Sequence, residues 1–157
     1  MINKISKLVI AFTSILIVSC TTQQTTAPSL IDGDIYTGTE SVKYLADGVA
    51  DRVFFATNKY NISSKGTETL SKQANYLKSN PNLNVSLEGH ADERGTREYN
   101  LALGEKRANA VKDYLISNGI SSARVNVISY GKEKPVNPAS TAAAWSQNRR
   151  TVTVKIN

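Results

Sequence analysis

The pattern of apolar and polar positions changes sharply near the amino terminus. Residues 8–18 are apolar apart from Thr13 and Ser14, and Lys4 and Lys7 precede them. This run is shorter than the roughly 20 apolar residues that a membrane-spanning helix needs. A basic start followed by a short apolar segment is typical of a secretory signal peptide, which we assign to residues 1–19.

A polar stretch follows, and the regular pattern of a folded domain begins only after it. Residues 21–36 are rich in Thr, Gln, Ser and Gly and contain few apolar side chains. Such a composition predicts a flexible tether, which we extend from the Cys20 region to residue 42. Residues 43–157 are then predicted to form one domain of ordinary size, and no internal repeat is visible in them.

Within this domain, two periodicities alternate. Two segments show a helical period: one from Ser63 or Ser64 to Ser79, the other from Arg97 to Ser117, where Asn118-Gly119 provides a stop signal. Residues 141–146 predict a further short helix. Four β-prone segments, 52–56, 85–89, 125–130 and 151–156, predict strands. The order β-α-β-α-β-(α)-β predicts an α/β fold of the α+β sandwich type, with a four-stranded mixed sheet and helices packed on one face.

Candidate chemistry gathers where the predicted strands end. Asp92 follows the strand 85–89, and Arg107 comes fifteen positions later in the second long helix. Asn100 and Arg107 are seven positions apart, so they project within about 20° of each other around that helix. An acid and a base held close together can bind a zwitterion. The spacing therefore indicates a binding site, with nothing in it that demands catalysis.

Composition removes several functional classes. Without Lys4 and Lys7 the formal net charge falls from +6 to +4, and the basic residues are scattered, so we expect no binding of nucleic acid. His90, Asp92 and Glu93 offer one nitrogen ligand only, which is thin support for a metal site. A glycosidase needs two opposed carboxylates, and Glu88 lies within a predicted strand. We therefore expect no metal, no cofactor and no enzymatic activity.

The end of the signal has its own motif. Ile17-Val18-Ser19-Cys20 resembles the lipobox of bacterial lipoproteins, and Cys20 is the only cysteine of the chain. The resemblance implies that Cys20 carries lipid, and Thr21 after it favours the outer membrane. Several acyl chains on one residue make release from a membrane negligible. The expected location is the outer membrane, lipid-anchored, with the domain facing the periplasm.

The domain itself resembles a known family. The carriers of the resemblance are Asp92, Gly95, Tyr99-Asn100, Leu103, Arg107-Ala108, Val111 and Tyr114-Leu115, which are similar to the OmpA-like peptidoglycan-binding domain. The fuller runs Gly89 to Thr96, Ser129 to Pro135 and Asn148-Arg149-Arg150 resemble the peptidoglycan-associated lipoproteins, or Pal proteins, of this family. The resemblance spans roughly Arg52 to Val154.

This resemblance implies non-covalent binding of the peptidoglycan stem peptide through its meso-diaminopimelate. It implies that Asp92 takes the ammonium and Arg107 the carboxylate, with a lining formed by Asn100, Leu103, Phe55, Asn58, Asn148 and Arg149. It also implies TolB and other Tol proteins as partners, and a role in envelope integrity and cell division. In this family the first strand exit usually carries Asp, where this chain has Ala56 and Asn58.

Several alternatives remain at this point. Arg107 could pair with a surface acid of its own helix, such as Glu105, and Asp92 could serve only as a turn residue. The protein could be a generic OmpA-domain lipoprotein outside the Tol system, a hydrolase of the cell wall, or a relative of the flagellar stators. A stator relative should have a transmembrane helix before the domain, where this chain has the lipobox motif.

Overall fold

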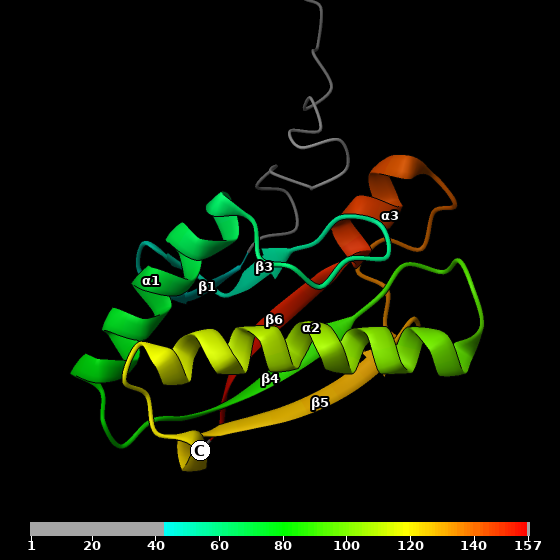
Figure 1. Cartoon of the computed structure of the whole chain (residues 1–157). Coiled ribbons are helices and arrows are strands. Elements are labelled where there is room, and N and C mark those ends of the chain that lie inside the picture. Colours follow the sequence, from blue (N-terminus) through cyan, green and yellow to red (C-terminus); the bar gives the residue numbers. More distant parts are fainter. Residues whose placement is uncertain (1–42, 157) are drawn as a thin grey trace, which may run out of the picture.

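The computed structural model describes residues 43–156 (Figure 1). The predicted signal peptide, Cys20 and the tether lie outside the described residues. Among residues 43–156, the helices are too short or too polar to cross a membrane.

A four-stranded mixed sheet forms the centre of the domain. Its strands are β3 (Arg52–Phe54), β4 (Asn84–His90), β5 (Val125–Gly131) and β6 (Arg150–Ile156), in the order β3-β6-β4-β5. β4 runs parallel to β5, whereas β6 pairs antiparallel with both β3 and β4. The last strand thus lies inside the sheet, and the predicted mixed sheet is confirmed.

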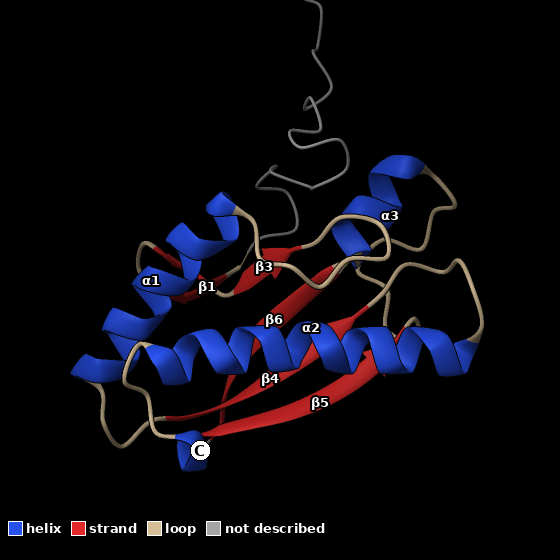
Figure 2. Cartoon of the chain, in the orientation of Figure 1, coloured by secondary structure: helices blue, strands red, loops and turns tan. Residues whose placement is uncertain are grey.

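Two long helices pack on one face of this sheet, as Figure 2 shows. They are α1 (Ser64–Ser79) and α2 (Arg97–Ser117). Each begins at a hydroxyl cap, because Ser63 accepts from Gly66 N and Thr96 accepts from Tyr99 N. α2 ends before Gly119, whose φ of 87° is the left-handed conformation that glycine adopts readily. The predicted bounds of α2 and the predicted packing are confirmed.

A contact between two backbones fixes the place of α2 on the sheet. A Cβ atom at Gly89 of β4 would collide with the carbonyl oxygen of Gly104 in α2. A Cβ atom at Gly104 would lie 2.9 Å from the carbonyl oxygen of Gly89. Because neither residue has a side chain, the helix rests directly on the strand, just before the strand ends at His90.

The hydrophobic core lies between the two long helices and the sheet. It contains side chains from α1, α2, the strands β3, β4 and β5, and two connecting segments. Its buried members are Val53, Phe55, Leu70, Ala74, Leu77, Val85, Leu87, Ala108, Val111, Leu115, Ile120 and Val125. The two segments in which a helical period was found supply much of this set.

The structure also contains elements that the periodicity did not predict. β1 (Tyr44–Ala46) and β2 (Val49–Ala50) form a hairpin, and Ser122–Arg124 form a turn of 3-10 helix. Segments of two or three residues are too short to show an alternation. The short helix α3 (Ala142–Asn148) begins after its cap Thr141 and ends two residues later than predicted.

Candidate functional site

The site is built around the loop of residues 91–96, which connects β4 to α2. Asn100 Nδ2 donates to the carbonyl oxygens of Arg94 at 2.8 Å and Thr96 at 3.1 Å. From the opposite side, Lys132 Nζ donates to the carbonyl oxygens of Glu93 and Gly95. The first turn of α2 and the segment after β5 therefore hold this loop in one conformation.

Asp92 lies at the start of this loop with its side chain largely buried. It is 7% exposed, and its Oδ1 accepts from the backbone N of Arg94 at 3.1 Å and from Arg94 Nε at 2.9 Å. Its Oδ2 accepts from Arg94 Nη2 at 2.8 Å and from Arg149 Nη1 at 3.4 Å. Asp92 thus does cap a turn, as one hypothesis held, and it also meets two guanidinium groups.

These contacts keep Asp92 ionised. Burial raises the pKa of the Asp92 carboxyl, but the hydrogen bonds and positive charge of Arg94 and the hydrogen bond from Arg149 outweigh it, so the pKa lies below its usual 3.8. At neutral pH the site therefore presents a carboxylate, as the binding of an ammonium group requires.

Arg107 reaches the same region from α2 and is 0% exposed. Its Nε donates to Lys59 O at 2.9 Å, its Nη1 to His90 O at 2.7 Å and its Nη2 to Ala56 O at 3.1 Å. The guanidinium therefore points into the interior, away from the exposed Glu105 on the helix surface. It connects the loop after β3 with the end of β4.

The charge on Arg107 responds to the other groups of the site. Burial and, after it, the positive charge of Arg149 lower the pKa of Arg107, whereas Asp92 and Tyr99 raise it; together they bring the pKa from 12.5 to about 10. Arg149 itself is buried and donates from Nε to Phe55 O at 2.9 Å. Three guanidinium groups thus surround one carboxylate, an excess of positive charge that suits a ligand with a carboxylate of its own.

The other predicted site residues differ in how they are placed. Asn58 is exposed and has a φ of 55°, in the turn that follows β3. Leu103 is buried in α2, and the Phe55 side chain lies in the core with its carbonyl oxygen toward Arg149. Asn148 Oδ1 accepts from the backbone N of Val136 at 2.8 Å, so its amide shapes the segment after β5. The structure therefore brings Asp92, Arg107 and Arg149 together, whereas Asn148 positions the segment after β5.

Sequence reasoning missed Arg94. This residue forms the closest ion pair with Asp92, and its Cζ lies 4.3 Å from the centre of the Trp145 ring. Trp145 Nε1 in turn donates to Glu93 Oε1 at 2.8 Å. The sequence did contain an indication of this contact. An Asp side chain often accepts a hydrogen bond from the backbone N–H two residues later, and two residues after Asp92 stands Arg94.

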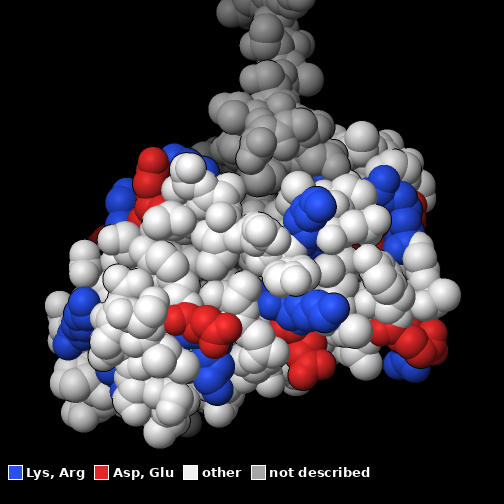
Figure 3. Space-filling view, in the orientation of Figure 1, with Lys and Arg blue, Asp and Glu red and all other residues white. Residues whose placement is uncertain are grey.

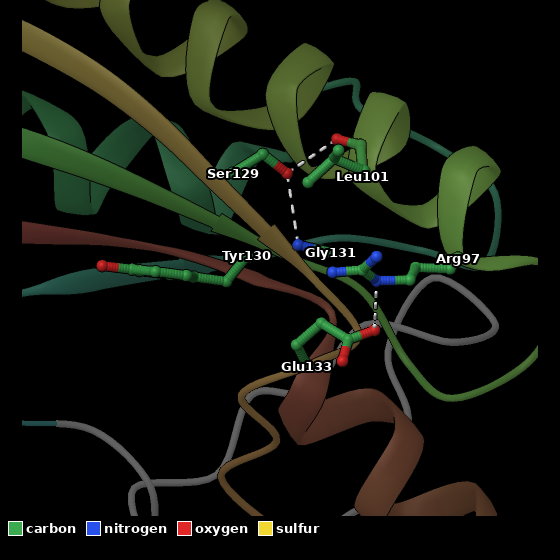
Figure 4. A pocket seen from close by; sticks show the side chains of 6 residues that line it. All are labelled: Arg97, Leu101, Ser129, Tyr130, Gly131 and Glu133. Atoms are coloured by element: carbon green, nitrogen blue, oxygen red, sulfur yellow. Dashed lines mark hydrogen bonds and ion pairs between the residues drawn. The ribbon is translucent and has the colours of Figure 1, made fainter.

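A cavity of about 230 Å³ lies outside this group of residues, between α2 and β5 (Figure 4). An ion pair at its rim joins Arg97 Nε to Glu133 Oε1 at 3.3 Å. The lining consists of Arg97, Leu101, Ser129, Tyr130, Gly131 and Glu133, and contains none of the predicted site residues. Figure 3 shows acidic and basic side chains interspersed on the face that carries the helices.

The second carboxylate considered for other chemistry, Glu88, lies beside His90. Glu88 projects from the face opposite α2, where its Oε2 lies 3.8 Å from His90 Nε2. Residues 43–156 contain no group of three or more His, Cys, Asp or Glu side chains that could hold a metal ion.

His90 provides a pH prediction. Burial, together with the positive charges of Arg150, Arg52 and Lys134, lowers the pKa of His90 from 6.5 to about 3. In the unfolded chain His90 is protonated as the pH falls below about 6.5, whereas in the folded state it stays neutral until about pH 3. The free energy of unfolding therefore decreases as the pH falls. From pH 7 to pH 5 we expect a loss of about 2 kcal/mol in the free energy of unfolding.

Urea unfolding at several pH values measures this slope, and His90→Gln is the comparison. His90 is the only histidine of the chain, so the variant should show an almost flat profile between pH 7 and pH 5. The carboxyl of Asp92 does not interfere, because its lowered pKa affects stability only below about pH 4. Equal slopes in the two proteins would show that His90 is not held neutral.

The sequence agrees with one family over the whole of this site. Residues 54–149, more than half of the chain, match the model of the OmpA family. The chain belongs to the OmpA family. The matched residues of this OmpA-family domain run from β3 to Arg149 and so include Asp92, Arg94 and Arg107.

Two relatives within the family carry the same name. A peptidoglycan-associated lipoprotein of Rhizobium meliloti is 55% identical over 106 residues, which are 68% of this chain and 60% of the relative. The crystal structure of the peptidoglycan-associated lipoprotein from Burkholderia pseudomallei is 42% identical, with a TM-score of 0.66, and the match covers 68% of this chain and 90% of that one. The chain thus spans about 60% of the length of the first curated relatives it matches.

A likeness to a more distant structure shows the fold alone. The carboxyl-terminal domain of MotB from Helicobacter pylori matches with a TM-score of 0.64 at 18% identity, over 68% of this chain and 84% of that one. The OmpA-like fold itself rests on the more similar structure from Burkholderia pseudomallei, and this chain has the same kind of four-stranded mixed sheet with helices packed on it.

Proposed function

We propose that this OmpA-family domain binds peptidoglycan non-covalently through the meso-diaminopimelate of the stem peptide. One observation carries the proposal: the Asp92 carboxylate lies within hydrogen-bond reach of Arg94 and Arg149, and near Arg107, at the end of β4. The free end of diaminopimelate has an ammonium and a carboxylate, which match one acid and an excess of bases. The relatives named as peptidoglycan-associated lipoproteins support the same conclusion.

Each group has a separate role in this proposal. Asp92 accepts hydrogen bonds from the ligand ammonium, because its carboxylate stays ionised at neutral pH. Arg107 supplies positive charge toward the ligand carboxylate from a position fixed by three backbone carbonyls. Arg149 adds a second charge beside it. No covalent bond is made or broken, so the site acts by binding alone.

The wider role rests on the same relatives. We propose a lipoprotein anchored to the outer membrane through Cys20, with the domain in the periplasm, that links this membrane to the cell wall. TolB and the other Tol proteins are the proposed partners, and envelope integrity and cell division the processes served. The second candidate is a wall-binding OmpA-domain lipoprotein outside the Tol system, and capture of TolB by the purified protein separates the two.

Co-sedimentation with purified sacculi tests the binding site. Asp92→Asn keeps the shape of the side chain and removes its charge, so we expect the affinity to fall about 10- to 100-fold, as for the loss of a charged hydrogen bond. Asp113→Asn is the matched control, because Asp113 is an exposed acid of α2. It should sediment like the wild type.

Two results would count against the proposal. Undiminished sedimentation of Asp92→Asn would remove Asp92 from the site. Release of soluble muropeptides from sacculi by the wild-type protein would favour a hydrolase over a binding domain.

A further inference from the structure

We propose that Arg94 determines which stem peptides this site accepts, by occupying Asp92 until the ligand ammonium displaces it and by then pairing with the ligand's side-chain carboxylate. This inference rests on the proposed function and adds a residue that determines specificity.

The first observation is that Arg94 already fills the place of a ligand cation. Its Nε and Nη2 form a two-pronged contact with Oδ1 and Oδ2 of Asp92, at 2.9 and 2.8 Å. The Arg94 side chain is 41% exposed and that of Asp92 9%, so the guanidinium covers the carboxylate from the solvent side. An ammonium group that approaches Asp92 from solvent must take over oxygen atoms that Arg94 now holds.

The second observation is that Arg94 has other contacts at the rim of the site. Its guanidinium lies over the Trp145 ring, and its Nη2 donates to Thr57 Oγ1 at 3.2 Å. Trp145 is fixed to Glu93 by the hydrogen bond from its indole nitrogen. A guanidinium displaced from Asp92 therefore remains beside the ligand, supported by an aromatic face that favours cations.

The two deeper arginines, Arg107 and Arg149, are held in place by backbone carbonyl groups. Arg107 donates to three backbone carbonyls and Arg149 to the carbonyl of Phe55, and both side chains are buried. Among the three guanidinium groups around Asp92, Arg94 is thus the exposed one, at the surface that a stem peptide approaches.

This arrangement discriminates between two classes of ligand. A simple amine, such as the lysine of a lysine-type stem peptide, breaks the pair between Arg94 and Asp92 and offers Arg94 no anion in return. Diaminopimelate brings a carboxylate next to its ammonium, so one ion pair is exchanged for two. Arg94 therefore favours the zwitterionic side chain in two ways. It binds the carboxylate of diaminopimelate, and it weakens the binding of a simple amine, which must break the pair between Arg94 and Asp92 without replacing it.

Calorimetric titration with two tripeptides measures this preference. L-Ala-γ-D-Glu-meso-diaminopimelate and L-Ala-γ-D-Glu-L-Lys differ only in the carboxylate at the end of the side chain of the third residue. The readout is the ratio of their affinities. We expect Arg94→Gln to lower this ratio about tenfold, as for the loss of one charged hydrogen bond. Binding of the lysine peptide should strengthen, because its ammonium then meets an Asp92 carboxylate that Arg94 no longer holds.

The control is Arg97→Gln, since Arg97 is an exposed arginine three positions further on, paired with Glu133. It should leave the ratio unchanged. Arg94→Lys keeps the charge without the two-pronged geometry and should give an intermediate ratio. Circular dichroism and the melting temperature verify that each variant is folded.

The outcomes separate the two proposals. An equal loss of affinity for both peptides in Arg94→Gln, or no change at all, would overturn the role of Arg94 and leave the proposed function standing. Failure of the wild-type protein to bind either peptide would overturn the proposed function, and this inference with it.

Discussion

Arg107→Ala is expected to lose about 3–5 kcal/mol of the free energy of unfolding, together with binding to peptidoglycan. The truncation leaves the carbonyl oxygens of Ala56, Lys59 and His90 without the donor that satisfies them in the interior. A buried acceptor without a partner costs about 1–3 kcal/mol, and water entering the gap recovers part of the sum. Arg107 therefore supports the fold and the site at once.

Urea unfolding at pH 7 measures the effect, and two variants interpret it. Arg107→Lys keeps the charge but cannot reach all three carbonyls, so its stability should lie between those of the wild type and the alanine variant. Arg97→Ala removes an exposed arginine and should change the free energy of unfolding by less than about 0.5 kcal/mol. An Arg107→Ala protein as stable as the Arg97→Ala control would contradict the supporting role.

Gly89→Ala is expected to destabilise the domain by about 3 kcal/mol or more, at the upper end of the cost of overpacking. The new methyl group would collide with the carbonyl oxygen of Gly104, which is backbone and has no rotamer to change. Helix α2 would have to move away from β4. Because Asn100 and Arg107 both lie on α2, the movement would also disturb the loop of residues 91–96.

Thermal unfolding tests this close contact, with Gly66→Ala as the control. A Cβ atom at Gly66 would lie 3.0 Å from Ile62 Cγ2, so this methyl group must shift by a few tenths of an ångström, whereas alanine favours the helix by about 1 kcal/mol. The control should therefore remain within about 1 kcal/mol of the wild type. A Gly89→Ala protein that melts at the wild-type temperature would show that α2 can be packed without the close approach.

The sequence was sufficient for those parts of the fold that depend on local patterns. The apolar period of α2 and the Asn118-Gly119 stop predicted a helix whose bounds the structure confirms. The placement of Asp92 directly after a strand predicted its position at the end of β4. The hairpin of β1 and β2 was missed, because strands of three and two residues show no period.

The internal contacts of the site could not be predicted in the same way. Arg107 bonds to backbone atoms of residues 48 and 51 positions away, and a carbonyl oxygen leaves no mark in the sequence. Arg94 was overlooked because exposed arginines in polar loops are common, and only the geometry shows that it covers Asp92.

The same contacts give a physical account of one departure from the family pattern. Where the family usually carries Asp, this chain has Ala56, yet the Ala56 carbonyl oxygen accepts from Arg107 Nη2 at 3.1 Å. That hydrogen bond does not depend on the side chain at position 56. The loop after β3 can therefore hold Arg107 without the acid.

Chemical-shift changes in the ¹⁵N-labelled domain, on addition of the diaminopimelate tripeptide, test the central claim most directly. We predict that the largest changes fall on the loop of residues 91–96, on residues 56–59, and on the side-chain Nε signals of Arg94, Arg107 and Arg149. The lining of the cavity between α2 and β5 should change little. Shifts gathered at that cavity, or no shifts at a saturating concentration of peptide, would contradict the assignment of this site.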